Sequence, residues 1–93
     1  MKYVIIEDVL TREISDEVFV YIRKTGRLLS FSETGAFIWK LIEKGFDREM
    51  IISSLINEYI TDEETAIIDF EKFILMLSSK GLIKNPSVQQ KIS

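Results

Sequence analysis

Carboxylates are the side chains of this 93-residue sequence with the most capacity for chemistry. A pair of carboxylates can act as general acid and base, and segment 47–71 is rich in them. Its eight acidic residues are Asp47, Glu49, Glu58, Asp62, Glu63, Glu64, Asp69 and Glu71. Most of them fall at predicted helix starts or on polar helix faces, where capping and solvation account for them. They predict no catalytic site.

The other groups on which enzymes usually depend are missing. The sequence has no Cys and no His, which excludes disulfides, a thiolate nucleophile and an imidazole base. Its serines, Ser30, Ser32, Ser53 and Ser54 among them, have no His to activate them, although a Lys base is formally possible. The four Gly are isolated, so there is no phosphate loop, and no acidic run has the spacing of a calcium loop. We predict a binding protein without catalytic activity, metal or cofactor.

Composition and hydropathy limit the class of protein. Apolar residues make up 46% and charged residues 29% of the chain, as in an ordinary globular domain. No apolar run approaches the roughly 20 residues of a membrane span, and the first residues do not resemble a signal peptide. We therefore expect a cytoplasmic protein with a single domain over residues 1–83 and a flexible polar tail over 84–93.

Two segments in the first third of the sequence predict a β-hairpin. Residues 17–23 are β-branched or aromatic at their centre, and a short polar connection ending in Gly26 follows them. Residues 27–31 form the returning strand, in which Leu29 and Phe31 share one face. Residues 3–6 and 9–15 are weaker strand candidates.

The middle of the chain predicts two helices. Ser32 is expected to cap the first helix with its hydroxyl, and Gly45 is placed for the left-handed position that follows the helix. The apolar residues between them, including Trp39, favour a core role. Asp47 is expected to cap a second helix over 48–59, whose apolar residues repeat at the spacing of a buried face.

A third helix is predicted over 62–80, opened by a capping box at Thr61 and Glu64. Its expected core stripe comprises Ala66, Ile67, Phe70, Phe73, Ile74 and Leu77. Three apolar residues, Ile68, Leu75 and Met76, fall outside this stripe. They either pack on the ends of the chain or line a groove for a partner. Strands followed by three helices indicate an α+β domain.

From Gly26 to Ile83 the sequence resembles the PqqD-like family, whose members are also called RiPP recognition elements. The matching residues are Gly26-Arg27-Leu28-Leu29-Ser30-Phe31-Ser32, Thr34-Gly35-Ala36, Ile38-Trp39, Glu43-Lys44-Gly45, the Ile51-Ile52…Leu55…Tyr59 run, Asp69…Phe73 and Leu77…Lys80-Gly81-Leu82-Ile83. Ser32 stands where the family often has Asn, which is an equally good helix cap.

The resemblance implies a winged helix-turn-helix-like fold, with a three-stranded antiparallel sheet followed by three helices. It also implies a partner, namely the leader segment of a ribosomally made precursor peptide. In this family the leader adds as a strand beside the third strand and packs against the third helix. The domain then presents the precursor to a modifying enzyme, either a radical SAM protein or a leader peptidase.

An open sheet edge beside an apolar helix is itself a peptide-binding arrangement. The predicted strand residues of the site are Arg27, Leu28, Leu29, Ser30 and Phe31. On the third helix, the favoured flank carries Asp69, Lys72, Phe73 and Met76. The opposite flank, with Ile67, Glu71 and Leu75, remains an alternative at this point.

Two other functions compete with peptide binding. A winged-helix fold can bind DNA, but segment 47–71 has one basic residue, Arg48, against eight acidic ones, and phosphate repulsion opposes docking there. A general interaction or dimerisation domain is the second alternative, because an open edge strand can pair with a second copy. We expect no nucleic acid and no membrane as partners, and a homodimer is left open.

Overall fold

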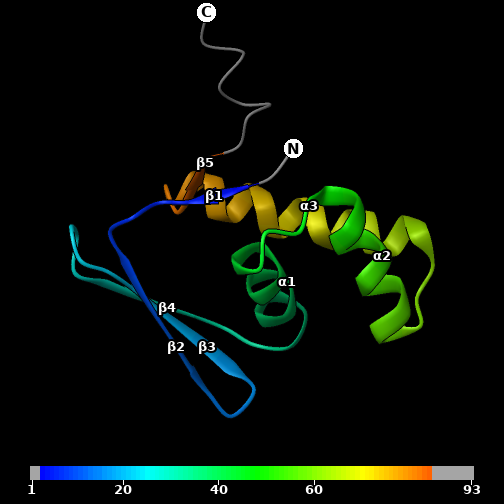
Figure 1. Cartoon of the computed structure of the whole chain (residues 1–93), viewed down its shortest axis with the longest axis horizontal. Helices are drawn as coiled ribbons and strands as arrows, with labels where there is room; N and C mark the ends of the chain where they lie inside the picture. The colour runs from blue at the N-terminus through cyan, green and yellow to red at the C-terminus, as the bar shows by residue number, and fades with distance from the viewer. Residues whose placement is uncertain (1–2, 85–93) are drawn as a thin grey trace, which may run out of the picture.

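The computed structural model describes residues 3–84, and within them the α+β architecture expected from the sequence is confirmed (Figure 1). Three strands form an antiparallel sheet in the order β2-β3-β4, where β2 is Val9–Ile14, β3 is Glu17–Ile22 and β4 is Arg27–Phe31. Three helices follow, with α1 over Glu33–Glu43, α2 over Arg48–Tyr59 and α3 over Glu63–Ser79. None of these helices is both long and apolar enough to cross a membrane.

The hairpin of β3 and β4 has the predicted register. Val18 lies opposite Phe31 and Val20 lies opposite Leu29, so the apolar residues of both strands share one face. Val18, Val20 and Phe31 are buried against the helices. Gly26 closes the turn with φ +75°, a conformation that costs glycine little.

A second, two-stranded sheet joins the two ends of the described chain. Strand β1, Val4–Ile5, pairs antiparallel with β5, Ile83–Lys84. Strand β5 was not predicted. The predicted tail over 84–93 begins inside this strand, because Lys84 pairs with Val4. The rest of that tail, residues 85–93, lies outside the described residues.

Helix α1 lies between the three-stranded sheet and α3, as Figure 1 shows, and its buried side chains hold the core together. Trp39 is fully buried, and its ring lies 5.6 Å from that of Phe31 on β4. Phe70 of α3 is also fully buried. The core as a whole comprises Val18, Val20, Ile22, Phe31, Ala36, Ile38, Trp39, Leu41, Ile42, Ile51, Ile52, Leu55, Ala66, Phe70, Ile74, Leu77, Leu82 and Ile83.

Two of the three predicted helix caps differ from the expectation. Ser32 does occupy the N-cap position of α1, but its hydroxyl makes no capping hydrogen bond. The next residue, Glu33, has φ +53°, and this left-handed start moves the first turn away from the usual capping geometry. Asp47 caps α2 as predicted, since its Oδ1 accepts a hydrogen bond from the Met50 N–H at 2.9 Å.

The third cap is Asp62 rather than Thr61, so the predicted capping box is wrong. Oδ1 of Asp62 accepts a hydrogen bond from the Thr65 N–H at 2.8 Å. Asp is a better N-cap than Thr, and the helix starts where the better acceptor is. The bonds from Thr65 also hold the pKa of the Asp62 carboxyl below its usual range.

The stripe predicted for α3 is buried at its centre and half-buried at its borders. Ala66, Phe70, Ile74 and Leu77 are buried, whereas Ile67 and Phe73 are half-buried. Of the three apolar residues outside the stripe, Met76 packs partly against the core. Ile68 and Leu75 are 46% and 70% exposed.

Candidate functional site

Strand β4 is an edge strand of the three-stranded sheet. It pairs with β3 on one side, and no described residue pairs with its other side. The backbone N–H and C=O groups of that free side can accept an added strand. The free strand edge needed for strand addition, which was only a conjecture from the sequence, is therefore present at β4.

The side chains of β4 divide between the two faces of the sheet. Leu29 and Phe31 face the helices, and Arg27 is on the same side because side chains alternate along a strand. Leu28 and Ser30 point to the opposite face, as predicted. Leu28 is 64% exposed there.

The exposed face of the sheet carries an apolar row. Leu28 lies opposite Tyr21, which lies opposite Leu10 on β2. Their exposed fractions are 64%, 39% and 53%. Leu28, although part of the predicted site, therefore lies in this row and not beside α3.

A cavity of about 370 Å³ lies between α1 and α3, close to the end of β4. All four residues of the favoured α3 flank line it. The full lining is Thr34, Gly35, Ile38, Asp69, Lys72, Phe73 and Met76. We call this cavity, together with the free edge of β4, the β4–α3 groove.

The aromatic ring of Phe73 connects the cavity to β4. It meets the ring of Phe31 edge to face, with the ring centroids 5.0 Å apart. Phe31 is buried and Phe73 only half-buried, so Phe73 forms part of both the core and the cavity wall. An edge-to-face pair of this kind adds about 0.5–1.5 kcal/mol beyond simple burial.

Gly35 allows α1 to approach α3 closely at this point. A Cβ atom placed on Gly35 would lie 3.0 Å from Cε1 of Phe73 and 3.5 Å from Cβ of Phe31. Any larger residue would therefore press on the Phe73 ring. Thr34, Gly35 and Ile38 were missed as site residues, although the Thr34-Gly35-Ala36 block was part of the family resemblance.

The opposite flank of α3 has different surroundings. Nη2 of Arg48, on α2, lies 3.0 Å from Oε2 of Glu71, and Ile67 packs on the core. Leu75 is mostly exposed, and none of the three residues on this flank lines the cavity. The ion pair also occupies the one basic side chain of segment 47–71, which further weakens the DNA-binding alternative.

A smaller cavity of about 210 Å³ adjoins the groove at the start of α3. It shares Thr34 and Asp69 with the first cavity and reaches Tyr59 at the end of α2. The Tyr59 phenol is neutral at physiological pH, and burial raises its pKa further above its ordinary value. At the start of α3 the groove is thus extended by a recess that combines the Asp69 carboxylate with apolar side chains and a neutral phenol.

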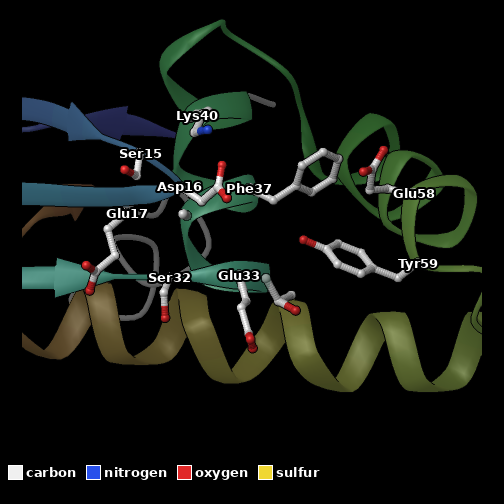
Figure 2. A pocket seen from close by; sticks show the side chains of 11 residues that line it. Ser15, Asp16, Glu17, Ser32, Glu33, Phe37, Lys40, Glu58 and Tyr59 are labelled. Atoms are coloured by element: carbon white, nitrogen blue, oxygen red, sulfur yellow. The ribbon is translucent and has the colours of Figure 1, made fainter.

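A larger cavity, of about 820 Å³, lies on the other side of the α1 N-terminus (Figure 2). Its lining includes Asp16, Glu17, Glu33 and Glu58, and Figure 2 shows their carboxylates pointing in different directions and not converging on one point. Among residues 3–84, no group of three or more His, Cys, Asp or Glu is placed to hold a metal ion. This cavity does not have the geometry of a carboxylate metal site.

Comparison with known families identifies the fold. Residues 17–83, most of the chain, match the family described as Coenzyme PQQ synthesis protein D (PqqD). The chain belongs to the PqqD family. No protein among the curated sequences matches it.

Two solved structures are similar to this PqqD-family chain. TbiB1 in complex with the TbiA(beta) leader peptide is 32% identical, with a TM-score of 0.84 over 91% of this chain and 96% of that chain. Lasso peptide synthetase B1 complexed with the leader peptide has a TM-score of 0.83 over 91% and 100% of the two chains, at 14% identity. The second likeness shows the fold alone, whereas the first shows family membership over nearly the whole length of both proteins.

Proposed function

We propose that this protein binds the leader segment of a ribosomally synthesised precursor peptide and presents the precursor to a modifying enzyme. The observation that carries the proposal is the β4–α3 groove, a free strand edge beside a cavity lined by one flank of α3. The complex of TbiB1 with a leader peptide, in a relative of the same fold and length, supports it.

Binding combines two kinds of interaction. The leader adds as a strand along Arg27–Phe31, where backbone groups supply hydrogen bonds that depend little on sequence. Its side chains on the helix side then enter the cavity beside Phe73 and Met76, which selects apolar residues. Asp69 and Lys72 are exposed and contribute weaker charge contacts. Leu28 and Ser30 contribute backbone groups only.

The role is that of a non-catalytic adaptor in the cytoplasm. The chain has neither Cys nor His, so the chemistry belongs to its enzyme partner, which is either a radical SAM protein or a leader peptidase. Mass spectrometry should find a precursor peptide unchanged after incubation with this protein alone. A mass shift under those conditions would contradict the adaptor role.

The direct test is calorimetry with the short peptides encoded beside the gene, using the TbiA(beta) leader as a second probe. At least one neighbouring peptide should bind with a dissociation constant of about 1 μM or tighter, which is about −8 kcal/mol. A scrambled peptide of the same composition is the matched control. If no neighbouring peptide binds at high concentration, leader binding is excluded.

A further inference from the structure

A cavity of about 690 Å³ lies at the opposite end of β4 from Phe31. Its walls come from β1 and the residues after it, from the turn between β3 and β4, and from the end of α3; Figure 1 shows this turn and the β1–β5 pair on the same side of the molecule. Four of the lining residues are basic: Lys24, Arg27, Lys80 and Lys84. We call this space the basic cavity.

Positive charge is in excess in the basic cavity. The lining also contains Glu7 and Asp8, but Oδ1 of Asp8 already accepts from Nε of Arg23 at 3.3 Å. None of the four basic side chains has an ion-pair partner within residues 3–84. The protein as a whole carries a net charge of −3, so this concentration of cations is a local feature.

The basic cavity and the cavity beside Phe73 lie at opposite ends of β4. Phe31 at one end of β4 contacts Phe73 of α3, while Arg27 at the other end shares the basic cavity with Lys80, just past α3. Strand and helix therefore run in opposite directions along the groove. A peptide strand on the free edge of β4 that extends past Arg27 meets the basic cavity.

The two ends of the groove differ in charge. At the Phe31 end the charges of Asp69 and Lys72 balance, while the Arg27 end has four basic residues against Glu7 and the paired Asp8. Unlike hydrogen bonds between backbones, such a difference distinguishes the two directions in which a strand could add. Arg can bind a carboxylate with two parallel hydrogen bonds, and Lys acts as a point charge.

We propose that the basic cavity is an anion site that takes acidic side chains of the leader peptide and so sets the direction of the added strand. This inference rests on the proposed function, since it assigns the occupant of one end of the same groove. Attraction between the cavity and an acidic leader also accelerates association at low salt.

The first experiment tests the anion site without any leader. The probes are acetyl-tetraglutamate amide and acetyl-tetraglutamine amide, added to ¹⁵N-labelled protein at low ionic strength. The glutamate peptide should shift the amide signals of Lys24, Lys80 and Lys84, the glutamine peptide should not, and added salt should reverse the shifts. Equal shifts around Arg12 and Lys44, or no shifts, would overturn the proposal.

The second experiment compares two double variants that change net charge equally. Lys80→Glu/Lys84→Glu alters the basic cavity, and Arg12→Glu/Lys44→Glu alters exposed residues that do not line it. The first should weaken tetraglutamate binding about tenfold, because each exposed pair contributes up to about fivefold, and the second should leave it unchanged. If the melting temperature of Lys80→Glu/Lys84→Glu falls, Lys80→Gln/Lys84→Gln replaces it, because this variant removes the charges without reversing them.

The same variants separate this inference from the proposed function. Suppose that a peptide encoded beside the gene binds the parent and binds both double variants as tightly as it binds the parent. The anion-site proposal would then be wrong, and leader binding would remain intact. The anion-site proposal would also be wrong if Lys80→Glu/Lys84→Glu lowered affinity for the modifying enzyme but not for the peptide. In that case the enzyme, and not the leader, would occupy the basic cavity. If no neighbouring peptide binds the parent, the proposed function fails whatever tetraglutamate does.

Discussion

The two flanks of α3 differ in what the rest of the chain places beside them. One flank, with Lys72, Phe73 and Met76, lines a cavity next to the edge strand β4. The other has Glu71 paired with Arg48 of α2, and Leu75 at 70% exposure. The more exposed apolar residue is thus on the flank without the cavity. An apolar side chain that is half-buried in a concave wall binds a ligand better than one that projects into water, because its surroundings already restrict it.

The largest difference between the flanks should come from Met76→Glu. A buried charge in the groove opposes apolar leader side chains, and affinity for the leader should fall about tenfold or more. The matched control is Leu75→Glu, which should bind the leader as tightly as the parent. Calorimetry measures both, with melting curves to show that each variant folds. If both variants retain parent affinity, the groove is not the binding site; if only Leu75→Glu loses it, the opposite flank is.

Gly35→Ala should produce an intermediate loss. The new methyl would lie 3.0 Å from the Phe73 ring and push it toward the cavity, so leader affinity should fall several-fold, or about 1 kcal/mol. Ala also has a better helix propensity than Gly, by about 1 kcal/mol, and this gain offsets the destabilising effect of the close contact on the fold. The melting temperature should therefore stay near that of the parent. Ala36→Gly, one position further along α1 but away from the cavity lining, is the comparison. It should lower the melting temperature and leave affinity unchanged.

A smaller effect is expected for Lys72→Ala. This side chain lines the groove but is exposed, and a charge contact with the leader contributes under about 1 kcal/mol, or less than about fivefold in affinity. The effect should disappear in high salt, because ions screen exposed pairs. A salt-independent loss of more than tenfold would mean that Lys72 is buried by the peptide.

Glu71→Gln should have the smallest effect. It breaks an ion pair in which the Arg48 side chain is 43% exposed and the Glu71 side chain 54% exposed. The free energy of unfolding should therefore change by less than about 1 kcal/mol. Leader affinity should not change, because the pair lies on the flank away from the groove. Reduced affinity with an unaltered melting temperature would show that the leader reaches this flank.

Local chemistry in the sequence was enough to predict the β3–β4 hairpin and the helices. The β-branched and aromatic run within residues 17–23 and the turn at Gly26 specify neighbours that are adjacent along the chain. Pairing of Val4 with Lys84 was not predictable in this way, because two-residue strands at opposite ends of the chain have no periodicity. The cap of α3 was misassigned by one residue, since Thr61 and Asp62 are both acceptable caps and only geometry chooses.

The candidate site was predictable only in part, because local sequence patterns do not say which distant elements come together. Helical periodicity places Asp69, Lys72, Phe73 and Met76 on one flank, but it does not say which element lies beside that flank. The choice depends on how closely α1 approaches α3, and that distance depends on the missing side chain of Gly35. The contribution of α1 to the cavity therefore became visible only in three dimensions.

Burial of Trp39 supplies an optical signal for these measurements. It is the sole tryptophan of the chain, and its Nε1 has no hydrogen-bond acceptor within residues 3–84, so the indole is in an apolar environment and emits at short wavelength. Phe31 packs against Trp39 at 5.6 Å and against Phe73 at 5.0 Å, so the groove wall is two rings from the fluorophore. Unfolding moves the emission to longer wavelength. Because Trp39 is the sole tryptophan, its fluorescence can be followed while unlabelled protein is titrated with tryptophan-free peptides. The Trp39→Phe variant, which lacks this fluorescence, is the control.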